Sequence, residues 1–571
     1  MKDTNKIFCS IVMDVLSAHG VKDVVCSPGS RNTPLLIASA ARENFRKHIV
    51  VDERSAAFMA LGLSLVSRRP VALICTSGTA LLNYSPAIAE AYYQGIPLIV
   101  ISADRPEQWI DQDDSQTLRQ FDALRNFVKN SYELPAFGEE QEELQWYANR
   151  ITNDAMMTAT GQKPGPVHIN IRLNEPLGLK GEFTEKKERV IKLLSADTLG
   201  NREELNHLAR ELSESKVMLV AGFMPPDSKM QRVITELAGN ENFVIMAETI
   251  SNLHLPYKSS SVDSVLSSYD DRVLDEHIPD IIISIGGAIV SRKLKEYLRR
   301  NSKRIHHWSP GFHHTTVDCF KSLSLRIEVD PFRFLRYMAN RLKKSGVKDS
   351  VSDFNNCWRQ LRENALNVKQ RFIHNSPWSE LNAFDIILNS IPQNYNLFLS
   401  NGTAIRYAQI IDYKLPHGSY CNRGVSGIDG SISTAIGGAV AYGGPTLIIT
   451  GDLSMAYDIS SLSLPNIPET TKIIVIDNQG GGIFRFIPST SELEEREEYF
   501  CACPSLPLKQ LAEGYGWEYM NVDNETDLKH IIEKFLSSDH KTILKVNCPP
   551  VISSEVLKNY FAVKVVKDMG K

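Results

Sequence analysis

Thr446-Leu-Ile-Ile-Thr-Gly-Asp-Leu-Ser454 is the stretch that decides the fold, together with a second stretch of the same kind, Thr471-Lys-Ile-Ile-Val-Ile-Asp-Asn-Gln-Gly-Gly-Gly482. Each contains a short apolar run without a polar face, which is typical of a parallel strand buried on both sides. Each run ends in a polar segment that contains glycine. Ligands of parallel α/β sheets bind at the carboxyl ends of strands, so the two stretches predict such a sheet with a binding site at one edge.

The polar segments offer oxygen atoms that suit a divalent metal. Asp452 supplies a carboxylate, Asn478 a side-chain carbonyl and Gly480 a backbone carbonyl. Mg²⁺ prefers such hard ligands and usually shares them with phosphate groups. The glycines also let backbone N–H groups approach phosphate oxygens. Either segment alone is an ordinary turn after a strand, whereas together they predict a site for a diphosphate and Mg²⁺, or Mn²⁺.

The same alternation of short apolar runs and helix-like stretches fills the rest of the chain. With 571 residues and ~100–200 residues per domain, we expect several domains. The pattern predicts three consecutive open parallel-sheet α/β domains, at residues 1–182, 183–350 and 351–571. The predicted strands are Asp23–Cys26, His48–Asp52, Val71–Cys75, Pro97–Ile101, Val167–Ile171, Val217–Ala221, Phe243–Ala247, Asp280–Ile285, Arg304–Trp308, Leu325–Val329, Leu397–Leu399, Ser419–Cys421, Thr446–Thr450, Ile473–Ile476 and Ile543–Val546.

Composition excludes several classes of protein. The net charge of −4 gives no reason to bind nucleic acid or an anionic membrane. No stretch reaches the ~20 apolar residues of a membrane span. The first twenty residues have the pattern of an amphipathic helix, which is not that of a signal peptide. The nine cysteines are odd in number and form no metal or disulfide pattern, which favours free thiols in a reducing compartment. We therefore expect a cytoplasmic protein.

Basic residues follow the predicted strands although the chain has no basic surplus. They are Arg31 beside Ser30, Arg105 with Gln116 in the loop beyond it, Arg292 with Lys293, Arg406 beside Thr403, and Arg423. A single arginine of this kind is usually a surface residue with an acidic partner. Five such elements suit substrates with several carboxylates, because the guanidinium group binds a carboxylate through two hydrogen bonds.

Glu53 follows the predicted strand 48–52 and begins a stretch of small residues. By itself it is an acidic residue in the first turn of a helix, where the helix dipole favours negative charge. The residues around Glu53, taken alone, favour this structural interpretation.

Seven blocks spread along the chain resemble those of a known family. They are Ser27-Pro-Gly-Ser-Arg-Asn-Thr-Pro34, Thr76-Ser-Gly-Thr-Ala80, Ser102-Ala-Asp-Arg-Pro106, Gly165-Pro-Val-His-Ile-Asn170, Asn422-Arg-Gly-Val-Ser-Gly-Ile-Asp-Gly430, Gly451-Asp-Leu-Ser454 and Gly480-Gly-Gly-Ile-Phe484. The pair Asp452 and Asn478 resembles the signature of thiamine-diphosphate-dependent enzymes. The narrower blocks resemble the 2-succinyl-5-enolpyruvyl-6-hydroxy-3-cyclohexene-1-carboxylate synthase family of menaquinone biosynthesis.

The resemblance implies a role for each matching residue. Glu53 activates thiamine diphosphate, Ile428 supports its bent form, and Asp452, Asn478 and Gly480 hold the metal. Arg406 and Arg423 bind the distal carboxylate of 2-oxoglutarate, with Thr403 nearby. Ser30, Arg31, Arg105, Gln116 and Arg292 or Lys293 face isochorismate. The implied catalytic residues are Glu53, Arg31, Arg406 and Arg423, and the implied cofactor-binding residues also include Ser77, Gly78, Ser426, Gly451, Leu453, Ser454, Gly481, Ile483 and Phe484.

The implied reaction is decarboxylation of 2-oxoglutarate followed by 1,4-addition of the succinyl carbanion equivalent to isochorismate. The family also implies a homodimer or homotetramer with active sites at the subunit interface. Two alternatives remain open. One is another thiamine-diphosphate 2-oxo acid decarboxylase or carboligase that resembles acetolactate synthase, and the other is a non-catalytic regulatory member.

Overall fold

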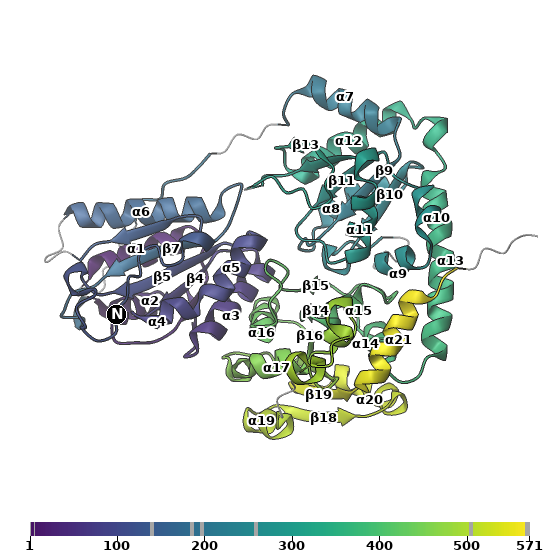
Figure 1. Ribbon diagram of the computed structural model, residues 1–571. Helices are drawn as coiled ribbons and strands as arrows, with labels where there is room; N and C mark the ends of the chain where they lie inside the picture. The colour runs from purple at the N-terminus through teal and green to yellow at the C-terminus, as the bar shows by residue number, and fades with distance from the viewer. Residues whose placement is uncertain are drawn as a thin grey trace, which may run out of the picture. The chain divides into compact units, whose positions relative to one another are not determined.

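The computed structural model describes residues 2–4, 6–136, 142–182, 188–194, 199–255, 261–313, 315–501 and 506–565. Three large parallel α/β sheets account for most of its strands (Figure 1). Two short strands, β1 (Lys2–Thr4) and β8 (Leu179–Glu182), pair antiparallel. The chain divides into two compact units, of which the first comprises Met1–Ser195, Asn422–Pro445 and Ser454–Thr471 and the second comprises Ala196–Cys421, Thr446–Leu453 and Lys472–Lys571.

The sheet of the first unit has the strand order β3-β2-β4-β5-β7-β6. Its strands are β2 (Asp23–Cys26), β3 (Arg46–Ile49), β4 (Val71–Cys75), β5 (Leu98–Asp104), β6 (Ser131–Leu134) and β7 (Val167–Arg172). The helices of the unit are α1 (Ile7–Ala18), α2 (Thr33–Ala40), α3 (Glu53–Ser67), α4 (Thr79–Asn83), α5 (Ser85–Gln94), α6 (Glu142–Thr160) and α16 (Ser431–Tyr442). One apolar core joins α1, α2 and α6 to the sheet, while α3 contacts β2 and β4 and also packs along α5 and α16.

The middle sheet, in the second unit, has the order β10-β9-β11-β12-β13. Its strands are β9 (Val217–Ala221), β10 (Phe243–Ala247), β11 (Ile281–Ile285), β12 (His306–Pro310) and β13 (Leu323–Ile327). Alternate residues of β9 point to opposite faces, so Leu219 joins one core and Val220 the other. Helices α7 (Arg202–Ser213), α8 (Ser228–Ala238) and α12 (Pro331–Ser345) cover the first face; α9 (Val262–Ser267), α10 (Asp271–Asp275), α11 (Arg292–Arg300) and α13 (Phe354–Asn375) cover the second.

The last sheet, also in the second unit, has the order β15-β14-β16-β17-β19-β18. Its strands are β14 (Asn396–Leu399), β15 (Gly418–Tyr420), β16 (Thr446–Gly451), β17 (Thr471–Asp477), β18 (Glu518–Val522) and β19 (Thr542–Asn547). The helices that follow α13 in this part are α14 (Glu380–Ser390), α15 (Thr403–Ala408), α18 (Pro488–Ser491), α19 (Leu508–Gly514), α20 (Glu525–Ser537) and α21 (Pro550–Ala562). Helix α17 (Asp452–Tyr457) begins directly after β16, and its residues from Ser454 on belong to the first unit. The fold class predicted from the sequence, three parallel α/β sheets in series, is confirmed.

Several predicted strands differ from the observed ones in their bounds. The strand predicted at His48–Asp52 is β3, which spans Arg46–Ile49, and Asp52 is instead the N-cap of helix α3. The predicted strands Arg304–Trp308 and Leu325–Val329 are each displaced by two residues from β12 and β13. Strands β6 and β18 were not predicted at all. Both are edge strands, and their partly exposed residues break the continuous apolar run that the prediction relied on.

Candidate functional site

In the second unit, β16 and β17 are neighbours, so the segments that follow them meet at one edge of the sheet. The backbone N–H of Gly480 donates to Oδ2 of Asp452 at 2.7 Å, and the N–H of Leu453 donates to Oδ1 of the same carboxylate at 2.7 Å. The structure thus brings Gly451, Asp452 and Leu453 together with the glycine run. These residues were predicted as parts of one site from positions far apart in the sequence.

Asn478 lies in the same place with its side chain buried and only 4 % exposed. Its Nδ2 donates to Oε1 of Glu380 at 2.8 Å, while its Oδ1 has no hydrogen-bond partner among the described residues. Leaving a buried carbonyl oxygen without a partner costs about 1–3 kcal/mol, so such an atom indicates a missing ligand. The unpaired Oδ1 of Asn478 lies at the same edge of the sheet as the carboxylate of Asp452, and this pair of oxygen ligands fits a divalent cation.

The electrostatics of this edge also fit a cation. Burial raises the pKa of Asp452 to about 6, and the neighbouring charge of Asp477 adds to that effect. Burial acts in the same direction on Asp477, but the ammonium group of Lys545, at 2.6 Å, outweighs it and lowers the pKa of Asp477. Asp452 is therefore a buried carboxylate beside a second acidic group, and a bound cation would favour its charged form.

The glycine run is held in a conformation that side chains would obstruct. Gly480 has φ +98°, and a Cβ at Gly482 would lie 2.3 Å from Nδ2 of Asn478. Gly481 donates its N–H to the carbonyl of Cys501 at 3.0 Å. Ile483 and Phe484 follow in a short 3-10 helix, Gly482–Arg485, and both are partly exposed. Side chains at these positions would collide with Asn478 and Phe484, so the loop conformation depends on the glycines.

Predicted substrate residues of the second unit lie near the ends of β14 and β11. Thr403 begins α15, and its hydroxyl lies beside Glu380. Arg406 donates from Nη1 to the carbonyl of Gly402 at 2.7 Å and is exposed. Burial raises the pKa of Asp263, an effect that the positive charges of Lys293 and Arg406 oppose.

Arg292 and Lys293 both belong to the first turn of α11 but differ in their surroundings. Arg292 forms an ion pair with Glu296 at 2.7 Å, and 76 % of its side chain is exposed. Lys293 is less exposed, at 48 %, and shares the neighbourhood of Asp263 with Arg406. Lys293 is thus the member of the pair that lies near another predicted substrate residue.

In the first unit, Glu53 is the first residue of α3 and is half-buried. Asp52 caps the helix by accepting the N–H groups of Arg54 and Ser55 at 3.0 and 3.3 Å. The negative charge of Glu53 contributes to the raised pKa values of Cys75 and Tyr84, both mainly due to burial, so Glu53 lies beside the end of β4. Its carboxylate makes no hydrogen bond or ion pair with any other residue that the structure describes.

Ser77 and Gly78 follow β4, and the loop that contains Gln116 covers them. Nε2 of Gln116 donates to the carbonyl of Ser77 at 2.7 Å, and a Cβ at Gly78 would lie 2.6 Å from Cγ of Gln116. A buried residue not predicted from the sequence, Gln120, accepts the N–H of Gly78 at 2.7 Å. Nothing in the sequence distinguished Gln120 from the other polar residues of this loop.

Arg31 and Arg105 lie near each other in the first unit. Burial lowers the pKa of Arg31, and the positive charge of Arg105 lowers it further. Arg31 donates to the carbonyl of Leu173 at 3.0 Å and pairs with Glu175 at 3.2 Å, while Arg105 pairs with Asp114 at 2.8 Å. Ser30 is exposed beside Arg31. Two adjacent guanidinium groups, with exposed acids as partners, favour an anionic ligand.

The segment 422–430, which contains Arg423, Ser426 and Ile428, also belongs to the first unit. Its backbone is fixed by Glu90 of α5, which is 2 % exposed and accepts the N–H groups of Gly424 and Val425 at 2.5 and 2.7 Å. A cavity of about 250 Å³ lies here, lined by Phe58, Pro86, Ala89, Glu90, Asn422, Val425, Gly427 and Asp429. Ile428 is 38 % exposed next to these residues. Glu90 was not predicted, because its helix carries no motif.

Ser454, the last of the predicted cofactor residues, is buried and accepts the backbone N–H of Asp458 at 3.1 Å. Asp458 in turn accepts the N–H and hydroxyl of Ser433, both at 2.7 Å, at the start of α16.

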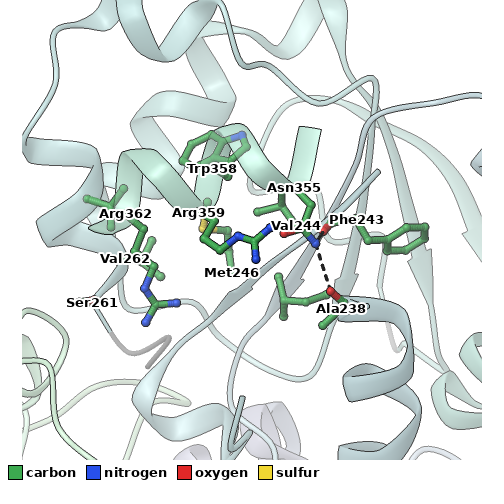
Figure 2. A pocket seen from close by; sticks show the side chains of 12 residues that line it. Ala238, Phe243, Val244, Met246, Ser261, Val262, Asn355, Trp358, Arg359 and Arg362 are labelled. Carbon is green, nitrogen blue, oxygen red and sulfur yellow. Dashed lines mark hydrogen bonds between the residues drawn. The ribbon is translucent and has the colours of Figure 1, made fainter. Parts of the chain in front are cut away.

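The crevice of the middle sheet is filled by the chain itself. Glu248, which is 1 % exposed, accepts the N–H groups of Val290 and Ser291 at 2.7 and 2.6 Å, just before α11. A Cβ at Gly222 would lie 2.3 Å from the carbonyl of Gly287. A dinucleotide phosphate bound at this sheet would need the N–H groups that Glu248 already accepts and the space that the carbonyl of Gly287 already fills. Figure 2 shows another cavity, of about 60 Å³, between β10 and α13, and none of its lining residues is a predicted site residue.

Comparison with protein families defines the class to which this fold and site belong. Residues 8–124 match the thiamine pyrophosphate enzyme N-terminal TPP binding domain, and residues 402–546 match the C-terminal TPP binding domain. The chain is thus a thiamine pyrophosphate enzyme by fold, and its two matched regions carry most of the residues described above.

Similar proteins narrow the class to one family. A 2-succinyl-5-enolpyruvyl-6-hydroxy-3-cyclohexene-1-carboxylate synthase of Porphyromonas gingivalis is 38% identical over 560 residues, which cover 97% of this chain and 96% of the relative. Synthases of the same name from Flavobacterium johnsoniae and Cytophaga hutchinsonii are 36% and 37% identical, each over 96% of this chain and 97% of the relative. The chain belongs to the 2-succinyl-5-enolpyruvyl-6-hydroxy-3-cyclohexene-1-carboxylate synthase family. Membership favours the synthase over the acetolactate-synthase-like alternative.

Proposed function

We propose that the chain decarboxylates 2-oxoglutarate and adds the succinyl unit 1,4 to isochorismate, with thiamine diphosphate and Mg²⁺ or Mn²⁺ as cofactors. The observation that carries the proposal is the meeting of Asp452, Asn478 and Gly480 at the ends of β16 and β17, with the buried Oδ1 of Asn478 unpaired. Membership of the synthase family supplies the substrates.

Each half of the proposed site has its own task. Asp452, Asn478 and the carbonyl of Gly480 would hold the metal, which would offset the negative charge of the diphosphate. Glu53 exchanges a proton with the pyrimidine ring of the cofactor, for which its partner-free carboxylate is suited. Bound thiamine diphosphate supplies the nucleophilic carbon and accepts the electrons released with CO₂.

The basic residues orient the two anionic substrates. Arg406 and Arg423, with Thr403, bind the distal carboxylate of 2-oxoglutarate. Ser30, Arg31, Arg105, Gln116 and Lys293 bind isochorismate, and Lys293 rather than Arg292 is proposed because it lies near Asp263 and Arg406. Few protons move in the reaction, so positioning and charge placement contribute most to catalysis.

We also propose that the active protein is a homodimer or a dimer of dimers in the cytoplasm. Glu53 belongs to the first unit and the metal residues to the second, and in the proposed assembly the two come from different copies of the chain. Among the described residues, no helix is long and apolar enough for a membrane span.

The decisive experiment supplies the purified chain with thiamine diphosphate, Mg²⁺, 2-oxoglutarate and isochorismate and measures CO₂ and the coupled product. We expect both to form in equal amounts, and neither in the absence of metal. If isochorismate is never consumed, or if pyruvate supplied in place of the two substrates is converted to acetolactate, the proposal is wrong.

A further inference from the structure

The buried amide of Asn478 can bind a cation only through its oxygen, so something must keep that oxygen facing the site. The amide has two ends of nearly equal size, and rotation by half a turn would replace Oδ1 with the Nδ2 donor. Solvent cannot select the orientation, because only 4 % of the residue is exposed. The selection must come from the groups around it.

Glu380 is the group that makes this selection. Its Oε1 accepts from Nδ2 of Asn478 at 2.8 Å, so this carboxylate oxygen favours the amide orientation that turns the NH₂ group toward Glu380. The flipped amide would place Oδ1 against that carboxylate. Glu380 is itself fixed, since it is 3 % exposed, begins α14, and donates its backbone N–H to the hydroxyl oxygen of Ser553 at 3.1 Å.

Arg485 holds the backbone of the same loop from the other direction. Its Nη1 donates to the carbonyl of Asn478 at 2.9 Å, and its Nη2 donates to the carbonyl of Gln479 at 3.0 Å. Gln479 has φ +59°, a left-handed conformation that a residue with a side chain rarely adopts. Glu497 pairs with Arg485 at 2.8 Å and so fixes the guanidinium group.

We propose that Glu380 is a positioning residue for the metal site, which keeps Oδ1 of Asn478 toward the cation while Arg485 holds the main chain of the loop. The inference rests on the proposed metal site. Partners of this kind behind a metal ligand typically change metal affinity 10–100-fold when they are replaced. Glu380 touches neither substrate nor metal in this account and acts only through Asn478.

The test measures Mn²⁺ binding by electron paramagnetic resonance in the full chain with thiamine diphosphate present, without any turnover. Glu380→Gln lets residue 380 donate as well as accept, so we expect Mn²⁺ to bind about 10–100-fold more weakly. Glu248→Gln is the matched control, because Glu248 is equally buried but lies beside the middle sheet. Its Mn²⁺ affinity should equal that of the wild type.

A second variant separates orientation from simple loss of packing. The double variant Glu380→Gln/Asn478→Asp exchanges the donor and the acceptor of this hydrogen bond. The amide at position 380 would donate to one oxygen of the carboxylate at position 478, and the other oxygen of that carboxylate would again face the cation. We expect Mn²⁺ affinity to return to within a few-fold of wild type. If Glu380→Gln binds Mn²⁺ as tightly as wild type, or if the exchanged pair fails to recover affinity, the inference is overturned. If the wild type itself takes up no Mn²⁺, the proposed function fails instead.

Discussion

Asp52 and Glu53 are consecutive acidic residues at the start of α3, and they differ in their hydrogen-bond partners. Burial acts to raise the pKa of Asp52, but hydrogen bonds from Ser460 and Ser55 outweigh it and lower the pKa. Asp52 is therefore fully engaged as a helix cap. Glu53, its neighbour, has no such partner among the described residues. The structure thus distinguishes a structural acid from a candidate acid–base group, which the sequence Asp-Glu alone could not do.

Glu53→Gln should abolish turnover while leaving the fold intact. Glutamine has the same shape but cannot exchange a proton, and such groups contribute about 10²–10⁴-fold to rates. The coupled assay with 2-oxoglutarate and isochorismate measures the loss. Glu43→Gln, an exposed residue before β3, serves as the control and should keep the full rate. A Glu53→Gln enzyme that turns over at the wild-type rate would remove Glu53 from the mechanism.

The site residues that could be predicted share one physical property. Asp452, Asn478 and Gly480 directly follow buried strands, and the strands themselves bring those positions together. Glu380 and Glu90 act from helices whose sequence gives no sign of their contacts. Their roles depend on tertiary packing, and such contacts cannot be inferred from local sequence.

At the scale of elements, the closest packing in the first unit is between α3 and α16. A Cβ at Gly62 would lie 1.8 Å from the carbonyl of Thr434, and a Cβ at Gly437 would lie 2.1 Å from the carbonyl of Met59. Each helix thus presents a glycine to the backbone of the other. The sequence alone could not identify α16 as the partner of α3, because the two helices lie far apart along the chain.

Gly62→Ala should destabilise the protein although alanine is the better helix former. The backbone of α16 cannot yield as a side chain would, and overpacking of this kind typically costs about 1–3 kcal/mol. Thermal unfolding measures the effect as a lower Tm. Gly514→Ala in α19 is the matched control, since nothing lies within 4 Å of its Cβ position, and it should leave Tm unchanged or raise it. Equal Tm values for the two variants would contradict the packing described here.

Lys369 holds together α13 and α21 in the second unit. Lys369 is 1 % exposed, and its ammonium group donates to the carbonyl of Tyr560, which lies near the end of α21, and to that of Val563 at 3.0 Å. On α13, Val368 and Phe372 are only partly buried, whereas Lys369 and Ile373 are buried. A lysine can occupy this buried position because the carbonyls at the end of a helix accept hydrogen bonds from a cation.

Lys369 makes stability depend on pH. Burial, and to a lesser degree the charge of Lys564, lowers its pKa from 10.5 to about 7. Between these two values the unfolded chain binds more protons than the folded one, so the contribution of Lys369 to stability rises with pH. Relative to Lys369→Met, the wild type should gain up to about 1 kcal/mol per pH unit from pH 7 to 10 in denaturant titrations. Exposed Lys558→Met is the control and should show no such trend.

At the scale of the molecule, the two units carry different parts of the proposed site. Glu53, Arg31 and Arg105 belong to the first, and Asp452, Asn478 and Arg406 to the second. In a dimer with twofold symmetry, each of two equivalent sites would take one half from each chain.

Mixing two inactive variants tests this arrangement. In a heterodimer of Glu53→Gln and Asp452→Asn chains, one site contains both substitutions and the other contains neither. Refolding or coexpressing equal amounts should therefore restore roughly a quarter of wild-type activity, since half of the dimers are mixed and each has one intact site. Each variant alone should stay inactive. A mixture without activity would mean that both halves of each site come from a single chain.

The first and last sheets have the same strand order, β3-β2-β4-β5-β7-β6 and β15-β14-β16-β17-β19-β18. Strand for strand, Thr76-Ser77-Gly78 after β4 occupies the position that Asp452 occupies after β16. Duplication of one module would produce this shared order. In the proposed site, the edge of the first sheet would face the organic ring of the cofactor, and the same edge of the last sheet would offer a carboxylate to the metal ion.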